Sequence, residues 1–337
     1  MDLSVVLVVE KVRHQALGHR GAPNELAKPL LTGRTGPAMI DGSTGSGRLP
    51  DKCSLCGSTL REWCHKGQRC VLRCTACGLL SVPEGVKLTA AGVSIYEDES
   101  NVFFAGGNEN YYLDESNMWS CHAKLEWVKR HARPLGRLLD AGANFGHFLY
   151  AAKADFDAMG FDISPQAVRW SQEHFHVANH TASIYELPSE LRGPYDTVTC
   201  WDVLEHLPDP WQGLRVLRQV LKGDGILFLS TPDAGSVLAK LMGRRWHYVD
   251  PEQHLHLFNR RNIGMVLSRA GFQVVSQRSF GHYYRLQYVF DRLAQLHATG
   301  LLHWCAQLGQ AMPRLIRARR IYLRLGDVMG IAARPVA

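Results

Sequence analysis

A short apolar run in the middle of the chain ends in Asp140 and enters a turn that contains Gly142, Asn144 and Gly146. Backbone can approach a ligand closely in such a turn only at glycine, or at an asparagine that tolerates positive φ, because a larger Cβ-bearing residue is strained there. The carboxylate of Asp140 would face a cationic group of the ligand, directly or through water. The sequence therefore predicts a turn at which an acid meets an ammonium group.

A second acid, Asp162, ends the next short apolar run and is followed by Ile163. A carboxylate at the end of a strand in an open α/β sheet can accept both hydroxyls of a ribose. A dinucleotide fingerprint would require glycines at Asn144 and His147, so a nicotinamide cofactor does not fit this turn. We therefore expect a nucleoside-bearing cofactor whose other end is a cationic amino acid, and we place Asp140, Gly142, Asn144, Gly146, Asp162, Ile163 and Asp202 around it.

The third apolar run, residues 195–201, leads into Asp202, Glu205 and His206 with the spacing D-x-x-E-H. A neutral imidazole at this position is suited to accepting a hydroxyl proton near neutral pH. His206 as a base and His206 as a packing residue at the strand-to-helix junction both stay open. For the three residues together, a cofactor contact from Asp202 with structural roles for the other two is favoured over a shared metal ion, although one helical turn would place their donors on adjacent faces.

Two further histidines, His254 and His256, lie two residues apart, so an extended segment would direct both side chains to one face. His254 is the second candidate for acid–base chemistry, with Glu205 as a third catalytic candidate. A structural or substrate-shaping role is favoured for the pair over metal binding.

These motifs occur in an order that resembles the class I S-adenosylmethionine (SAM)-dependent methyltransferases, whose first motif reads D-x-G-x-G-x-G and here has Asn144 as its middle position. The resemblance spans about residues 137–280 and is greatest to the small-molecule subgroup that includes the ubiquinone-biosynthesis O-methyltransferases. It implies an α/β, Rossmann-like core with a seven-stranded sheet whose last strand is antiparallel, and SAM as cofactor. We expect residues 328–333 to form that last strand. In ubiquinone-type enzymes an acidic run similar to 202–206 is linked to a divalent metal, so the resemblance adds Mg²⁺ as a candidate cofactor.

Four cysteines form two C-x₂-C pairs separated by seventeen residues, which predicts a four-thiolate zinc ribbon of Cys53, Cys56, Cys74 and Cys77. With four ligands the ion has no open position, so Zn²⁺ would be structural. The first residues lack the basic flank of a secretory signal, which favours reduced thiols and a cytoplasmic protein over disulfides. Free or redox-active thiols remain the alternative, and Cys64, His65 or Cys70 could replace one ligand.

The composition, with 38 basic and 31 acidic residues and a net charge of +7, favours an anionic partner such as nucleic acid, a phosphorylated substrate or a membrane surface. No apolar run is long enough to span a bilayer. We divide the chain into a flexible tail (1–50), a zinc-ribbon module (51–83), an aromatic linker or lid (84–116) and a methyltransferase domain (117–337) with a helical insertion (284–324).

The leading hypothesis is methyl transfer from SAM to a small-molecule acceptor, most consistent with reaction at oxygen, on a sugar, quinone, lipid-linked or natural-product intermediate. One alternative is an RNA methyltransferase that uses the zinc ribbon and the basic segment 301–325 to bind phosphates. Against it, Cys200-Trp201-Asp202 stands where many base N-methyltransferases have Asn or Asp followed by Pro-Pro-Tyr. A non-catalytic SAM-binding scaffold is the other alternative.

Segment 301–325 also suits peripheral contact with an anionic membrane, although a solvated helix is favoured. The sequence indicates no oligomeric state.

Overall fold

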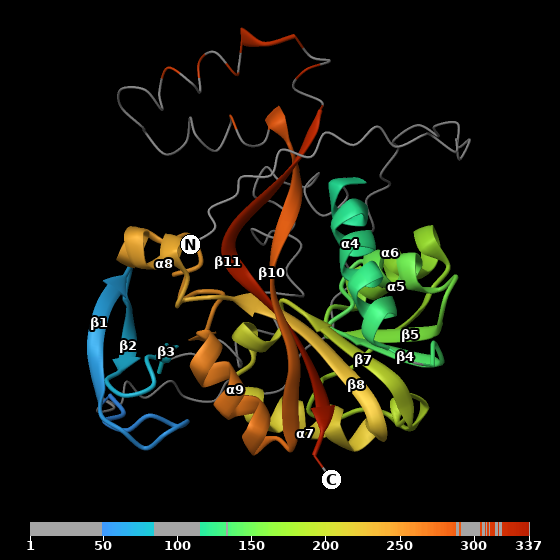
Figure 1. Cartoon of the computed structure of the whole chain (residues 1–337), viewed down its shortest axis with the longest axis horizontal. Coiled ribbons are helices and arrows are strands. Elements are labelled where there is room, and N and C mark those ends of the chain that lie inside the picture. The colour runs from blue at the N-terminus through green and yellow to red at the C-terminus, as the bar shows by residue number, and fades with distance from the viewer. Residues whose placement is uncertain are drawn as a thin grey trace, which may run out of the picture.

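The computed structural model of the chain describes residues 49–83, 115–132, 134–287 and 319–336, together with isolated positions between 290 and 316 (Figure 1). The predicted tail lies almost entirely outside these residues. So does the predicted lid, apart from Glu115 and Ser116, which begin the first helix of the described core. Of the basic segment 301–325, residues 319–325 and some isolated positions before them are described. Among the described residues, no helix is both long enough and apolar enough to cross a membrane.

The core of the described chain is a seven-stranded sheet with the strand order β10-β11-β8-β7-β4-β5-β6. Its strands are β4 (Arg137–Ala141), β5 (Asp157–Asp162), β6 (Ala178–Thr181), β7 (Tyr195–Trp201), β8 (Leu221–Pro232), β10 (Phe272–Arg285) and β11 (Arg320–Pro335). β11 is antiparallel to both of its neighbours, whereas the β8, β7, β4, β5 and β6 pairings are parallel. The prediction of a seven-stranded sheet with an antiparallel last strand is therefore confirmed. The last strand lies between β8 and β10, one position in from the edge.

Helices cover both faces of this sheet, as Figure 1 shows. They are α4 (Glu115–His131), α5 (His147–Ala152), α6 (Pro165–Phe175), α7 (Pro210–Val220), α8 (Val237–Met242) and α9 (Arg260–Arg269). One apolar cluster joins α4 and α5 to the sheet through Trp127 and Phe148, and another joins α7 and α9 through Leu214 and Ile263. The two faces are thus buried separately, as an open α/β sheet requires.

A second, four-stranded sheet contains the cysteine pairs and has the order β1-β2-β3-β9. β1 (Leu60–Lys66), β2 (Arg69–Cys74) and β3 (Leu80–Ser81) come from the predicted module, but β9 (His256–Leu257) comes from the core, between β8 and α9. β3 and β9 are antiparallel, with Leu80 opposite Leu257. The small sheet is therefore completed by a strand that lies about 175 residues further along the chain.

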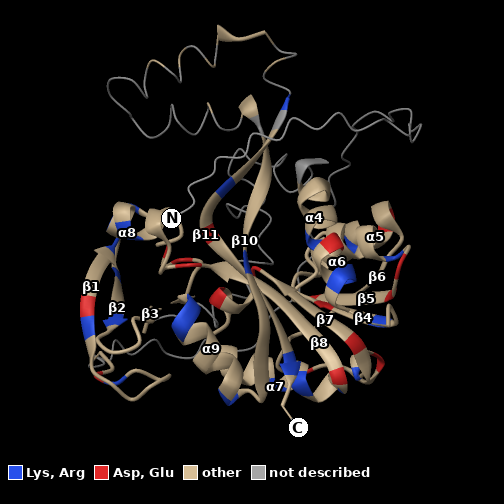
Figure 2. Cartoon of the chain, in the orientation of Figure 1, with Lys and Arg blue, Asp and Glu red and all other residues tan. Residues whose placement is uncertain are grey.

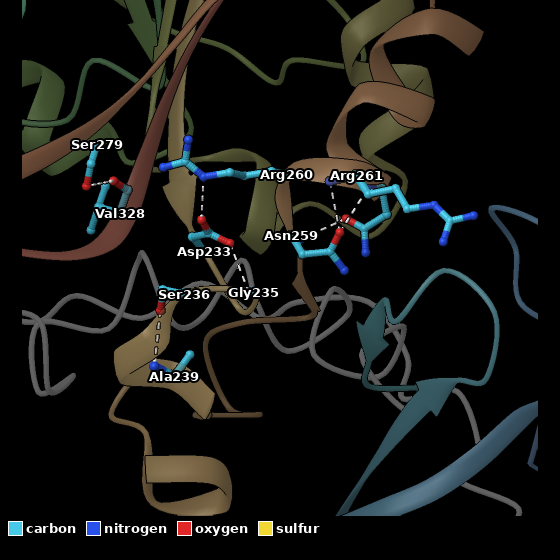
Figure 3. Close-up of polar contacts among 10 residues, drawn as sticks. Asp233, Gly235, Ser236, Ala239, Asn259, Arg260, Arg261, Ser279 and Val328 are labelled. Carbon is cyan, nitrogen blue, oxygen red and sulfur yellow. Dashed lines mark hydrogen bonds and ion pairs between the residues drawn. The ribbon is translucent and has the colours of Figure 1, made fainter. Parts of the chain in front are cut away.

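The N-terminus of α9 fastens the second cysteine pair to the core. The Asn259 side chain caps α9 by accepting from the backbone N–H groups of Arg261 and Asn262 (Figure 3). Its Nδ2 also donates to the carbonyl of Cys77 at 3.0 Å. Arg260, next along the helix, pairs with the buried Asp233 carboxylate at 3.0 Å, which joins the end of β8 to α9. One asparagine thus stabilises a helix end and the docked module together.

The ribbon of β10 and β11 is longer than predicted. It extends beyond β8, with Tyr283 opposite Tyr322, so residues 284–285 and 320–324, which the sequence placed in a helical insertion, are strand. The prediction was wrong at these ends because the arginines suggested a helical period. The β-branched and aromatic residues Ile321 and Tyr322 between them pair across the ribbon instead.

Replacing Asn259 by alanine should lower the free energy of unfolding by about 1 to 2 kcal/mol, because the helix cap and the bond to Cys77 are lost together. Urea unfolding followed by circular dichroism measures the change. Arg261→Ala is the matched control, since its exposed side chain is two residues further along at the same helix end. An equal loss in both variants would contradict a specific role for the asparagine.

Candidate functional site

The turn after β4 has the backbone conformation that the sequence predicts. Gly142, Asn144 and Gly146 have φ values of 77°, 48° and 72°. A Cβ on Gly142 would come within 2.3 Å of the Val203 side chain. Glycine is needed there both for its φ and because the segment after β7 packs directly against the turn.

The Asp162 carboxylate joins this turn to the end of β5. Its Oδ2 accepts from the backbone N–H of Asn144 at 2.8 Å, and its Oδ1 accepts from that of Ser164 at 2.9 Å. Burial raises the pKa of Asp162, and these backbone donors oppose the rise. Ile163, beside it, is 45% exposed. An ordered acid and an exposed apolar side chain therefore lie together at the carboxyl edge of the sheet, which is where such sheets bind ligands.

Asp140 lies beneath the turn and is 2% exposed. Its Oδ1 accepts from the Thr199 hydroxyl at 2.6 Å. Burial raises the pKa of Asp140 to about 7, against the lowering effects of Thr199 and of the Lys124 ammonium group. A carboxyl group buried to this degree favours the water-mediated form of the predicted contact with a cation.

Asp202 follows β7 in a left-handed conformation, with a φ of 55°. Ser230 donates to its Oδ1 at 2.8 Å, and the Lys124 ammonium group lies 3.0 Å from its Oδ2. Burial by itself would raise the pKa of Asp202, but the charges of Lys124 and His282 together with these hydrogen bonds hold it at about 2. The carboxylate is thus ionised and held in one orientation.

Sequence reasoning missed both Lys124 and His282. Lys124, in α4, is 8% exposed and lies over the Trp201 ring, with its Nζ 5.0 Å from the ring centroid. Its spacing of four residues from the buried Ser120 and Val128 placed a cation on the apolar face of the helix, which is the signal that could have identified it. His282, in β10, is brought to Asp202 only by the extension of the long ribbon, and burial lowers its pKa.

His206 and His254 lie together, with ring centroids 4.9 Å apart. The Nδ1 of His206 is 2.8 Å from the Gln253 carbonyl, and the Nδ1 of His254 is 2.8 Å from the Tyr248 carbonyl. Since a carbonyl only accepts, each Nδ1 is assigned the proton and each Nε2 keeps its lone pair. Burial lowers the pKa of both rings, that of His254 to about 3.

Glu205, which is 1% exposed, completes a group with these two histidines. The potential ligand atoms of Glu205, His206 and His254 all lie within 4.8 Å of one another. Burial, followed by the charge of Asp202, raises the pKa of Glu205 to about 8. Asp202 is not part of this group. Two imidazoles with one carboxylate suit a transition metal better than Mg²⁺, which prefers oxygen ligands. This group therefore gives no support to Mg²⁺, which stays a prediction from the sequence.

His256 has different neighbours from His254. Its Nε2 lies 3.4 Å from the Pro208 carbonyl, and its ring meets Trp211 edge to face with centroids 5.6 Å apart. The two histidines of this segment thus belong to separate environments, and His254 alone joins His206.

The four predicted zinc ligands converge on one point. The Sγ atoms of Cys53 and Cys77 are 3.8 Å apart, and those of Cys56 and Cys74 are 3.4 Å apart. All four lie within 4.8 Å of one another. Tetrahedral Zn²⁺ with Zn–S bonds of about 2.3 Å requires S–S separations near 3.8 Å, so the donor set fits this ion. His65 and Cys70 pair with each other across β1 and β2 and form, with Glu62, a separate group.

Comparison with known proteins gives one domain family, described as a methyltransferase domain, which matches residues 120–277. A ubiquinone biosynthesis O-methyltransferase of Xanthomonas axonopodis pv. citri (strain 306) is 34% identical over 115 residues, covering 32% of this chain and 48% of that protein. The protein of the same name from Bordetella avium (strain 197N) is 33% identical over 129 residues, covering 35% and 54%. This chain therefore spans about half the length of the curated relatives it matches.

A solved structure of the Burkholderia thailandensis 1,6-didemethyltoxoflavin-N1-methyltransferase, with bound 1,6-didemethyltoxoflavin and S-adenosylhomocysteine, superposes with a TM-score of 0.46 at 16% identity. It covers 82% of this chain and 100% of that one. The strand order, the antiparallel β11 and the match to the domain family agree with the resemblance found in the motifs. Residues 120–277 match the methyltransferase domain family, and the order of the strands around them is the one that the resemblance to the class I SAM-dependent methyltransferases implies.

Proposed function

We propose that this protein transfers a methyl group from SAM to an oxygen atom of a small-molecule acceptor. The observation that supports this most strongly is the bridging of the Gly142–Gly146 turn to the end of β5 by the Asp162 carboxylate. It fixes the turn and the acid in the relation that a nucleoside with a cationic amino-acid end requires. The names of the two relatives support an oxygen acceptor.

The residues of the carboxyl edge fit SAM by their chemistry. Asp162 can accept from the ribose hydroxyls through its remaining lone pairs, and the exposed Ile163 offers an apolar surface to the base. Asp140 balances the ammonium group through water, and Asp202 is held ionised by Lys124. When bound, SAM supplies a methyl group on a sulfonium, which is already a good leaving group.

The protein must therefore align the acceptor oxygen and remove its proton. His206 is the proposed base, because its Nδ1 is bonded to the Gln253 carbonyl and its Nε2 can accept a proton. His254 is the second candidate, and its ring adjoins that of His206. Burial keeps both imidazoles neutral, so neither needs to lose a proton before the reaction. The Glu205 carboxylate lies within 4.8 Å of both imidazoles and is the third member of this group.

A zinc ion held by Cys53, Cys56, Cys74 and Cys77 has a structural role in this proposal. Its four thiolate ligands leave no open position, and the second pair is bonded to α9 through Asn259. We propose that the ion stiffens the module so that β3 can pair with β9.

Incubation of the purified protein with labelled SAM and an extract of its source cells should label the small-molecule or lipid fraction.

In the same assay, His206→Ala should lower turnover by about 100-fold or more while SAM affinity is kept, because general-base catalysis contributes about this much. His122→Ala, an exposed histidine of α4, is the control. Label in RNA would overturn the acceptor assignment, and unchanged turnover of His206→Ala would transfer the role of base to His254.

SAM affinity should rise as the pH increases through about 7, because the Asp140 carboxyl group loses its proton there and then attracts the ammonium group. Calorimetric titration with SAM at a series of pH values measures this. Asp140→Asn should bind more weakly above pH 7 and should lose this pH dependence. The same slope in wild type and variant would show that another group titrates.

The purified protein should contain one zinc ion per chain, measured by elemental analysis. Cys74→Ser should lose the ion and melt at a lower temperature, because the bond energy of a structural site contributes to folding. Cys64→Ser, at a buried cysteine outside the quartet, should keep it. Full zinc content in Cys74→Ser would refute this ligand set.

A further inference from the structure

An open pocket of about 590 Å³ lies where the zinc module meets the core. The module contributes Ser54 to it, α7 contributes Trp211 and Arg215, β9 contributes His256 and α9 contributes Arg269. None of these residues belongs to the proposed SAM site or to the zinc ligands. The volume is within the range of about 300 to 1,000 Å³ that is usual for small-molecule sites.

The pocket has a net positive charge. Arg215 and Arg269 come from two different helices, α7 and α9, on whose ribbons the Lys and Arg positions are blue in Figure 2. Arg215 is exposed and, among the described residues, forms no ion pair. Within the same residues, Arg269 donates only to the Ser54 carbonyl, at 3.3 Å. The single acid of the lining, Asp209, uses its Oδ1 to cap α7 by accepting from Gln212. Both guanidinium groups are therefore able to bind an anion.

The wall of the pocket also contains polar groups without partners. His256 is 9% exposed, and its buried Nδ1 has no hydrogen-bond partner among the described residues. The same holds for Nε1 of Trp211, whose ring meets that of His256. Both atoms are shielded from solvent, so they leave one nitrogen acceptor or donor and one N–H donor without a partner behind the pocket wall.

We propose that this pocket binds an organic phosphate that has hydroxyl groups, and that this group is the anchor of the acceptor molecule. This rests on the proposed function. Guanidinium groups on two helices can each pair with a different oxygen of one tetrahedral phosphate. The Asp209 carboxylate is an acceptor for hydroxyl groups, and the Trp211 ring gives an apolar face.

The position of the pocket fits an anchor for the acceptor. His256 is two residues after His254, and Pro208, whose carbonyl meets the His256 ring, is two residues after His206. The two backbone segments that contain the proposed bases therefore also line the pocket, through Pro208 and His256.

Calorimetric titration of the zinc-loaded full chain with ribose 5-phosphate, inorganic phosphate and ribose tests the pocket. Ribose 5-phosphate should bind most strongly, inorganic phosphate more weakly and ribose not measurably. Arg215→Gln should weaken ribose 5-phosphate binding about tenfold, the loss of one charge-assisted hydrogen bond. Arg261→Gln, an exposed arginine of α9 outside the pocket, should have no effect. Arg269→Gln should act like Arg215→Gln, with its melting temperature measured because it also contacts the module.

Absence of phosphate binding at millimolar concentration, or equal weakening by Arg215→Gln and Arg261→Gln, would overturn the proposal. Tighter binding of a single-stranded RNA than of ribose 5-phosphate, with dependence on Arg215, would replace it by a nucleic-acid surface.

In the labelled-methyl assay, Arg215→Gln should reduce labelling at low extract concentration. At high extract concentration the labelling should recover, with SAM affinity unchanged. Unchanged labelling would assign the pocket to a ligand other than the acceptor. Failure of the wild type to transfer label would refute the proposed function alone, because the titration does not depend on it.

Discussion

Two hydrogen bonds to one carboxylate determine the geometry of the proposed cofactor site. Asp162, at the end of β5, accepts from Asn144 and Ser164, which belong to the turns after two neighbouring parallel strands. The backbone amides can reach the acid because Asn144 adopts a positive φ, and Gly142 permits Val203 to lie against the same turn. Parallel strands deliver their ends to one edge, but this carboxylate fixes how two of those ends face each other.

The partly buried ion pair of Lys124 and Asp202 fixes the geometry on the other side of the site. Lys124 reaches Asp202 from α4, a helix that precedes the sheet in sequence and covers one of its faces. Removing Asp202 would leave the buried ammonium group of Lys124 without a counter-charge, whereas the Asp202 side chain, which is 36% exposed, keeps some contact with solvent. The pair therefore ties the position of α4 to the conformation after β7, and the charges of Asp202 and Lys124 then influence the protonation of Glu205 and His282.

The sequence was informative where the chemistry is local. The turn from Asp140 to Gly146 and the two C-x₂-C pairs lie within short segments, so residue type and spacing were enough to predict their positive φ values and their convergence. His282 and Arg269 could not be found in this way, since each meets its partner only after distant elements pack together. For Lys124 the helical spacing marks a buried cation, but it does not indicate Asp202 as the partner. The ends of the long ribbon were misassigned for a related reason. The arginines near residue 320 have a helical spacing, which predicts a helix. The same residues form a strand because β11 pairs with β10 there.

The shared strand β9 has a consequence for how the chain is divided. Residues 51–83 precede the methyltransferase domain in sequence, yet β3 forms its hydrogen bonds with the segment that follows His254, and Cys77 is bonded to α9. Direct contacts between described residues therefore hold the module against the core. Deleting the module would expose the edge of β9 and the apolar surface around Phe258, both of which favour aggregation. Through these contacts, residues 51–83 and the core pack as one unit that is discontinuous in sequence.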